Sequence, residues 1–222
     1  MLHLHFSSPF PTVHFFVITM PKKYFFFRAA ILPIMLIAST AAFAFSPESF
    51  VQDARTQIGK TLQYDPSYIG IPYPMGDIPI IRGVCTDVVI RALRHQGIDL
   101  QQRVHEDIRK NFHLYPNQSR WGLKRPDTNI DHRRVPNLQR YFERRGYTVT
   151  DKTFLPGDIV TWNLRPQVEH IGIVSNQKDP TGQRPLIIHN IGQGAQEEDM
   201  LTHFTITGHY RMRAEDQTTR QR

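Results

Sequence analysis

The sequence contains a single cysteine, Cys85, among its 222 residues. One cysteine excludes an intrachain disulfide and any metal site built on a cysteine pair. It also leaves one free thiol, which makes Cys85 a candidate reactive group. The formal net charge is +7, but the sequence lacks a concentrated basic stretch or a nucleic-acid-binding motif. The composition therefore argues against a nucleic-acid partner.

Long hydrophobic runs are also scarce, and the one near the start is short. A basic cluster at 22–28 precedes an apolar run over 29–41 and the small-residue pattern Ala42-Phe43-Ala44. This order is typical of a secretory signal peptide, and the run ends too abruptly for a stable membrane span. We therefore predict a signal peptide over 1–44, with the true start at Met20, and a mature protein exported to the periplasm or cell envelope. A retained, uncleaved anchor is the alternative.

The rest of the chain, 45–222, is long enough for one domain with its own core. Apolar residues at helical spacing predict helices over 45–62, 83–97, 100–112 and 136–146. Alternation with a period near two predicts strands over 147–151, 158–163, 170–175, 185–191 and 205–213. Helices followed by strands indicate an α+β fold with an antiparallel sheet.

Cys85 lies where a loop is expected to become the second helix. The apolar face of that helix is formed by Val84, Val88, Val89, Ala92 and Leu93, and the opposite side by Arg91, Arg94 and His95. Unpaired backbone N–H groups and the positive end of the helix dipole favour an anion at this position. The sequence therefore predicts a lowered thiol pKa and a nucleophilic Cys85. The alternative is a small, buried, apolar cysteine.

Two histidines in the strand-rich half could act on that thiol. His170 shares a strand face with Gly172, which leaves room for a neighbouring side chain. On the next strand, His189 and Asn190 point to opposite faces, so only one of them can reach the ring of His170. In this reading His170 accepts the Cys85 proton, while His189 or Asn190 orients its ring.

Other residues are candidates for substrate contact. They are Tyr64, Tyr73, Asp87, Trp121, His132, Arg133 and Asn190. The tyrosines stand in a Pro- and Gly-rich loop before Cys85, where they could line a cleft or cover the edge of the core. His132 and Arg133 belong to a charged cluster at 131–134 that could form an anion-binding rim or a salt-bridged loop clasp. Asp87 also suits a structural role at the start of a helix.

The order of these motifs resembles that of the NlpC/P60-type papain-like cysteine peptidases and amidases. The shared pattern is a cysteine opening a helix, then Gly157-Asp-Ile-Val160, His170-Ile-Gly-Ile-Val174 and Ile188-His189. Around the cysteine this sequence reads Val84-Cys-Thr-Asp87, where that superfamily usually has Asp-Cys-Ser-Gly. The acidic residue has thus moved to the other side of the cysteine.

A resemblance to the bacterial envelope family called domain of unknown function 1287 (DUF1287) covers nearly all of 45–222. It is carried by Tyr64-Asp-Pro-Ser-Tyr68, Tyr73-Pro-Met-Gly-Asp77, Val84-Cys-Thr-Asp87, the stretch 130–138 and His189-Asn-Ile-Gly192. Together the two resemblances imply a papain-like domain, with the Cys85 helix packed on a C-terminal antiparallel sheet. They also imply nucleophile, base and orienting roles for Cys85, His170 and His189.

From this we expect an exported cysteine hydrolase that cleaves an amide bond through a thioester, without cofactor or metal. Peptidoglycan peptides or other envelope amides are the expected substrates. An acyltransferase would use the same residues. A non-catalytic envelope-binding module is the rival from another class, and deep burial of Cys85 or separation from His170 would favour it. A histidine-based metal site would instead require three or more histidines to converge.

Overall fold

The computed structural model describes residues 44–213, and the predicted signal peptide and start site lie outside this range. Helix α1 (Pro47–Arg55) begins after Ser46, whose hydroxyl accepts the N–H of Ser49 at 3.2 Å. It ends earlier than predicted, because the chain continues as turns through Gly59, which has a φ of +76°. Within 44–213 no helix has both the length and the apolar character needed to cross a membrane.

The remaining helices lie before residue 145. They are α2 (Cys85–His95), α3 (Leu100–Lys110), α4 (Asn117–Trp121) and α5 (Val135–Arg144), with the short 3-10 helices η1 (Phe112–Leu114) and η2 (Asp131–Arg133). The predicted helices at 83–97, 100–112 and 136–146 are thus present with shifted ends. Sequence reasoning missed α4, η1 and η2, which stand in a stretch without apolar periodicity.

The C-terminal half forms a five-stranded antiparallel sheet with the order β6-β5-β4-β3-β7. Its strands are β3 (Ile159–Arg165), β4 (Val168–Lys178), β5 (Pro185–His189), β6 (Gln196–Glu198) and β7 (Thr205–Tyr210). The predicted strand at 147–151 is reduced to one isolated bridge between Thr148 and Tyr210. Earlier in the chain, β1 (Gln63–Tyr64) and β2 (Arg82–Gly83) form a short parallel pair. The structure therefore has the α+β class expected from the sequence.

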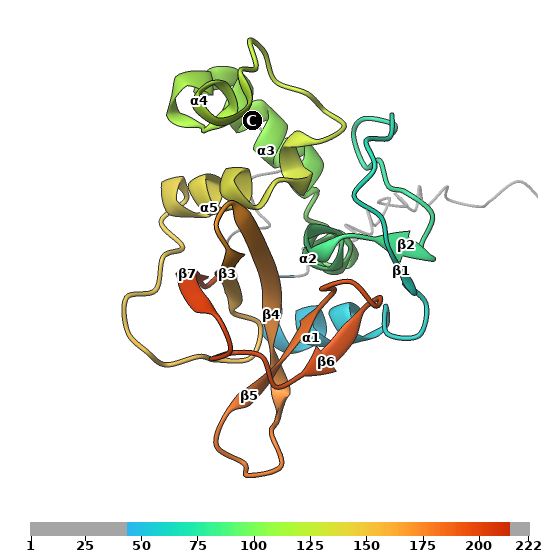
Figure 1. Ribbon diagram of the computed structural model, residues 1–222, viewed down its shortest axis with the longest axis vertical. Helices are drawn as coiled ribbons and strands as arrows, with labels where there is room; N and C mark the ends of the chain where they lie inside the picture. Colours follow the sequence, from blue (N-terminus) through green and yellow to red (C-terminus); the bar gives the residue numbers. More distant parts are fainter. Residues whose placement is uncertain (1–43, 214–222) are drawn as a thin grey trace, which may run out of the picture. The chain divides into compact units, whose positions relative to one another are not determined.

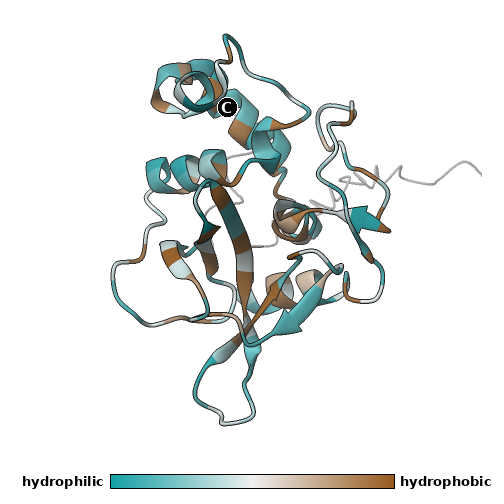
Figure 2. Cartoon of the chain, viewed as in Figure 1, coloured by the Kyte–Doolittle hydropathy of each residue, from teal (hydrophilic) through white to brown (hydrophobic). Residues whose placement is uncertain are grey.

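Alternating side chains of the sheet build two separate hydrophobic clusters. Ile171 and Ile173 of β4 pack with the helices, and Val174 packs on the other face with Trp162. Figure 1 shows α1 and α2 beside β4, and Figure 2 shows hydrophobic segments along β4 and α1. The first residue of α2 consequently lies close to the central strands of the sheet.

Arg91 corrects one expectation about α2. The sequence places it on the polar side, but only 4% of its side chain is exposed. Its guanidinium donates to both oxygens of Asp77 and to the hydroxyl of Thr61 at 3.1 Å. A buried arginine is tolerated when its donors are satisfied in this way. Arg91 therefore ties the loop before Cys85 to the helix that Cys85 begins.

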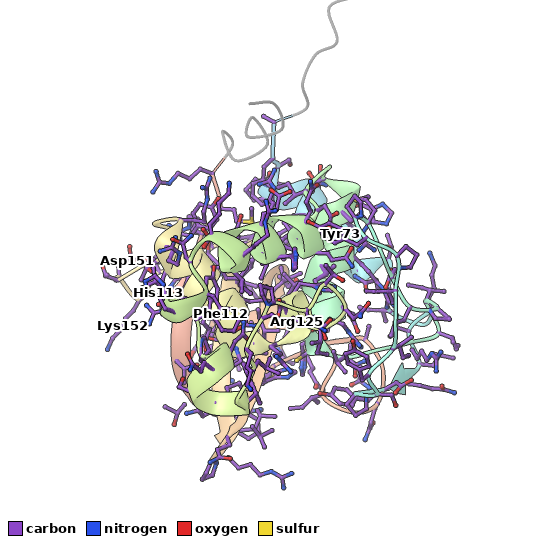
Figure 3. All side chains as sticks on the ribbon, turned by 90° about the horizontal axis from the view of Figure 1, so that it is seen from above. Tyr73, Phe112, His113, Arg125, Asp151 and Lys152 are labelled. Atoms are coloured by element: carbon purple, nitrogen blue, oxygen red, sulfur yellow. The ribbon has the colours of Figure 1, made fainter. Side chains whose placement is uncertain are left out.

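Helix α3 holds another part of that loop. The carboxylate of Asp99 accepts the N–H of Met75 at 2.8 Å, and the side chain of Gln101 accepts the N–H of Gly76 at 2.8 Å. Seen from above, Tyr73 lies near one end of α3 and Phe112 follows the other end (Figure 3). These bonds fix a segment that contains no regular secondary structure.

Candidate active site

Cys85 is the first residue of α2, and contacts on both sides fix the backbone there. The carboxylate of Asp87 accepts the N–H of Val84 at 2.7 Å, which caps the start of the helix. Just before it, the carbonyl of Gly83 accepts a hydrogen bond from the side chain of Asn190 at 3.1 Å. The position of the thiol is therefore set by its own helix and by the chain that leaves β5.

The sulfur of Cys85 is buried, with 4% of the residue exposed. Burial raises its pKa to about 12, although the backbone N–H groups of Ile171, Thr86 and Cys85 itself favour the thiolate. The sequence-based prediction of a lowered pKa is therefore wrong for this structure. The helix start does supply N–H groups, but removal from water outweighs them. Cys85 is a neutral thiol at neutral pH.

The N–H of Ile171 brings the thiol to strand β4. Ile171 follows His170 directly, so the N–H that contacts the sulfur belongs to the peptide bond between His170 and Ile171. Pairing between β4 and β5 reaches only as far as Ile173 and Ile188 at this end. The sulfur thus approaches β4 at an edge that β5 has left open, while the ring of His170 stands on the face that carries Trp162.

His170 and His189 are both buried and form a hydrogen bond. The Nε2 atom of His170 lies 2.8 Å from Nδ1 of His189, with the rings at 81°. Gly172 allows this approach, because a Cβ there would come within 2.6 Å of Ile187 and 3.1 Å of the Cβ of His189. Burial, followed by the neighbouring His189, lowers the pKa of His170 to about 3. His170 is therefore neutral at neutral pH, and the lowered pKa makes it a weak base while the site is buried.

Glu198 extends this pair, and sequence reasoning missed it. Its Oε1 lies 2.9 Å from Nε2 of His189. An ionised carboxylate only accepts hydrogen bonds, so Nε2 of His189 carries the hydrogen and Nδ1 accepts one from Nε2 of His170. Among residues 44–213, Nδ1 of His170 has no hydrogen-bond partner. It remains an acceptor for a proton. The three-residue strand that carries Glu198 is too short to give a periodic signal.

A pocket of about 230 Å³ opens beside the thiol. Its wall includes Cys85, Tyr64, Trp121, Arg133, Arg134 and Glu169. The hydroxyl of Tyr64 lies next to the sulfur, and burial followed by the nearby thiol raises the pKa of Tyr64 to about 12. Three of the residues predicted to contact substrate, Tyr64, Trp121 and Arg133, thus surround one pocket with the candidate nucleophile.

The other predicted contact residues lie outside the pocket wall. Tyr73 packs edge-on against His105, with ring centroids 5.2 Å apart. Asp87 is buried and forms a two-pronged ion pair with Arg133. Asn190 turns away from His170 toward Gly83, so His189 is the neighbour of the His170 ring.

His132 is likewise buried away from the pocket, and burial lowers its pKa to about 3. Within the described part of the chain, no group of three or more histidine, cysteine or acidic side chains is placed to hold a metal ion.

Comparisons with known proteins identify relatives of uncharacterised function. Residues 51–212 match the model of a domain of unknown function (DUF1287). The chain is also 57% identical over 162 residues to "Uncharacterized protein YijF" of Escherichia coli (strain K12), a match covering 71% of this chain and 78% of that protein. No solved structure matches the chain.

Proposed function

The chain belongs to the DUF1287 family, and on this premise we propose that it is an exported cysteine hydrolase of the papain-like NlpC/P60 type. It would cleave an amide bond through a thioester on Cys85, with peptides of the cell wall as the leading substrate class. The observation that carries the proposal is the 2.8 Å hydrogen bond between His170 and His189. His170 lies on β4, and the N–H of the next residue on that strand, Ile171, reaches the Cys85 sulfur.

In the proposed reaction the sulfur attacks the amide carbon while Nδ1 of His170 takes the thiol proton. The C–N bond then breaks, and the proton passes from His170 to the departing amine. Water attacks the resulting thioester, again with His170 as base, which releases the acid and restores the thiol. The backbone N–H of Cys85 at the start of α2 is the proposed donor to the oxyanion.

The Cys85 thiol and the His170 ring would both be neutral before the reaction starts. Burial keeps the thiol protonated and the His170 ring unprotonated, so no stable ion pair exists before substrate binds. Proton transfer would therefore accompany bond formation. An acyltransferase would follow the same first step and deliver the acyl group to an amine or alcohol in place of water.

Burial of Cys85 favours a second candidate function. With 4% of the residue exposed and a raised pKa, the thiol has the character of a structural cysteine. On this alternative the pocket binds an envelope component without cleaving it. The two candidates differ in whether a bound peptide is converted to product.

The decisive experiment incubates the full-length protein with a mixture of cell-wall peptides and follows products by mass spectrometry. The hydrolase predicts cleaved peptides that disappear in Cys85→Ala and His170→Ala but persist in His113→Ala, an exposed histidine. Product formation by Cys85→Ala would contradict the thioester mechanism. Peptide binding by the wild-type protein with no product at any time would establish the binding module.

Export is tested separately. The proposal predicts that protein recovered from the cell envelope begins near Phe45, because the Ala42-Phe43-Ala44 pattern matches a signal-peptidase site. N-terminal sequencing that still finds residues before Ala44 would contradict cleavage at this site.

A further inference from the structure

We propose that Arg134 and Trp121 form a carboxylate-binding subsite in the pocket beside Cys85, so that the substrate carries a carboxylate close to the amide that is cleaved. The position of the cleaved amide rests on the proposed function. Binding of the carboxylate does not, because it depends on the pocket wall alone.

Charge pairing within the wall singles out Arg134. Among the described residues, three arginines and one glutamate contribute to the wall. Arg120 pairs with Glu169 at 2.6 Å. Arg133 makes two 3.0 Å bonds to the buried carboxylate of Asp87. These two guanidinium groups are therefore neutralised by close partners.

Arg134 has only distant acceptors. Its nearest carboxylate oxygen, on Asp131, is 3.9 Å away, and the side-chain oxygen of Asn117 is 3.5 Å away. Burial raises the pKa of Asp131 to about 6, so this carboxylate is mostly ionised at neutral pH, but at 3.9 Å it is too far from Arg134 for a hydrogen bond. The side chain of Arg134 is 20% exposed. One positive charge in the pocket wall is thus left without a close anionic partner.

Trp121 holds this guanidinium in a defined orientation. The guanidinium carbon of Arg134 lies 4.3 Å from the ring centroid, and that of Arg120 lies 5.4 Å from it. Stacking on an indole fixes the plane of the guanidinium and leaves its edge free for hydrogen bonds. A planar, singly charged carboxylate matches both the fork of donors and the single uncompensated charge. An uncharged amide of the same shape has only one acceptor oxygen for the fork and no negative charge to balance the guanidinium.

The test uses two small probes of similar shape, N-acetylglycine, which carries a carboxylate, and N-acetylglycinamide, which carries an uncharged amide in its place. The chain has two tryptophans, so an ¹⁵N-labelled full-length protein gives two indole N–H signals. The indole of Trp162 donates to the carbonyl of Leu201 at 3.0 Å, which makes it an internal reference for the fold. We expect N-acetylglycine to shift the Trp121 signal, N-acetylglycinamide to leave it in place, and the Trp162 signal to stay constant with both.

Variants assign the effect to Arg134. Arg134→Gln should weaken binding of N-acetylglycine at least tenfold, which corresponds to about 1.4 kcal/mol. Arg134→Lys keeps the charge without the planar fork, so its affinity for N-acetylglycine should lie between those of the wild type and Arg134→Gln. The matched control Arg140→Gln removes an exposed arginine that pairs with Glu143 and should bind like wild type.

Equal shifts with both probes, no shift with either, or unchanged affinity in Arg134→Gln at a constant Trp162 signal would overturn the subsite. If N-acetylglycine binds through Arg134 but no amide is ever cleaved, the subsite stands and the hydrolase proposal fails. If cleavage occurs equally with and without a neighbouring carboxylate, the hydrolase stands and the subsite has no role in substrate choice.

Discussion

His189 presents Nδ1 to Nε2 of His170 at 2.8 Å and turns its own Nε2 to a carboxylate. Through these two rings in series, the contact with Glu198 determines which ring nitrogen of His170 carries a hydrogen. Glu198, whose side chain is 46% exposed, stands at the outer end of this series. In the proposed mechanism Glu198 would be a positioning residue, since it reaches His170 only through His189.

Replacing Glu198 with glutamine should reverse the direction of the hydrogen bonds that join Glu198, His189 and His170. A glutamine amide can donate to Nε2 of His189, which places hydrogens on Nδ1 of both rings and removes the acceptor that would take the thiol proton. We expect turnover of a substrate to fall about 10–100-fold. Imidazole ¹⁵N spectra should show both histidines changing tautomer, and this measurement needs no substrate.

Glu143→Gln is the matched control, because it alters another exposed carboxylate in a surface pair. Glu198→Asp keeps the charge and should recover part of the activity. Unchanged histidine tautomers in Glu198→Gln would show that Glu198 only supports β6.

The Cys85 thiol should react slowly with alkylating reagents at neutral pH. Its pKa is raised from 9.0 to about 12 by burial. Three pKa units reduce the thiolate fraction about a thousandfold, so iodoacetamide should modify the folded protein about a thousandfold more slowly than the urea-unfolded chain. The rate should keep rising above about pH 9. A plateau below that pH would show a lowered pKa and restore the prediction made from the helix start.

Asp87→Asn should destabilise the fold strongly. The change leaves the buried guanidinium of Arg133 without its anionic partner and weakens the cap on Val84. Breaking a buried ion pair in this way costs about 3–5 kcal/mol, measurable by urea unfolding. Replacing Arg133 with methionine in the same protein should recover much of that loss. If the double variant were as unstable as the single one, the cap on Val84 would be the larger contribution.

His132 should make the protein sensitive to mild acid. Its pKa is lowered to about 3 by burial, followed by Arg133 and Arg94, so the folded state keeps it neutral while the unfolded chain protonates it below about pH 6.5. The unfolded state then binds more protons, and the free energy of unfolding falls as pH decreases from about 6.5 toward 3. His170 acts in the same direction.

Asp131 opposes this trend, because its raised pKa makes the folded state hold a proton that the unfolded chain releases between about pH 4 and 6. His132→Gln should reduce the slope of the unfolding free energy against pH by up to about 1.4 kcal/mol per unit. The exposed residue change His113→Gln should leave the slope unaltered. Equal slopes in all three proteins would show that His132 is protonated in the fold.

Periodic segments were the part of this fold that sequence reasoning could predict. The apolar residues of α2 and the alternation through His170 and Gly172 gave the element types correctly, because burial repeats at the spacing of each element. The helix α4 lacks such a repeat and depends on contacts made by distant residues. The order of helices and strands sufficed for the α+β class. The short elements α4, η1, η2, β1, β2 and β6 were missed, the strand at 147–151 is only a bridge, and the ends of the other elements were displaced.

Site geometry was less accessible. Alternation showed that only one of His189 and Asn190 could reach His170, and the structure places His189 there because Asn190 bonds to Gly83. The predicted direction of the thiol pKa shift was wrong, because a helix start can be recognised from local sequence, whereas burial of the thiol depends on the packed sheet. Arg91 was misplaced for the same reason, since its partner Asp77 belongs to a loop. The pairing of Glu198 with His189 likewise depends on sheet register.

The division of the chain into helices followed by strands has a consequence for its synthesis. A nascent chain that has emerged as far as Arg144 contains Cys85 and the whole of α2 but neither His170 nor the N–H of Ile171. We therefore expect the thiol to gain its contact with β4 only when the last third of the protein folds onto the first. A ribosome-stalled or truncated product that ends before β4 would carry an ordinary, accessible cysteine, and burial of the thiol would follow only after the strands are made.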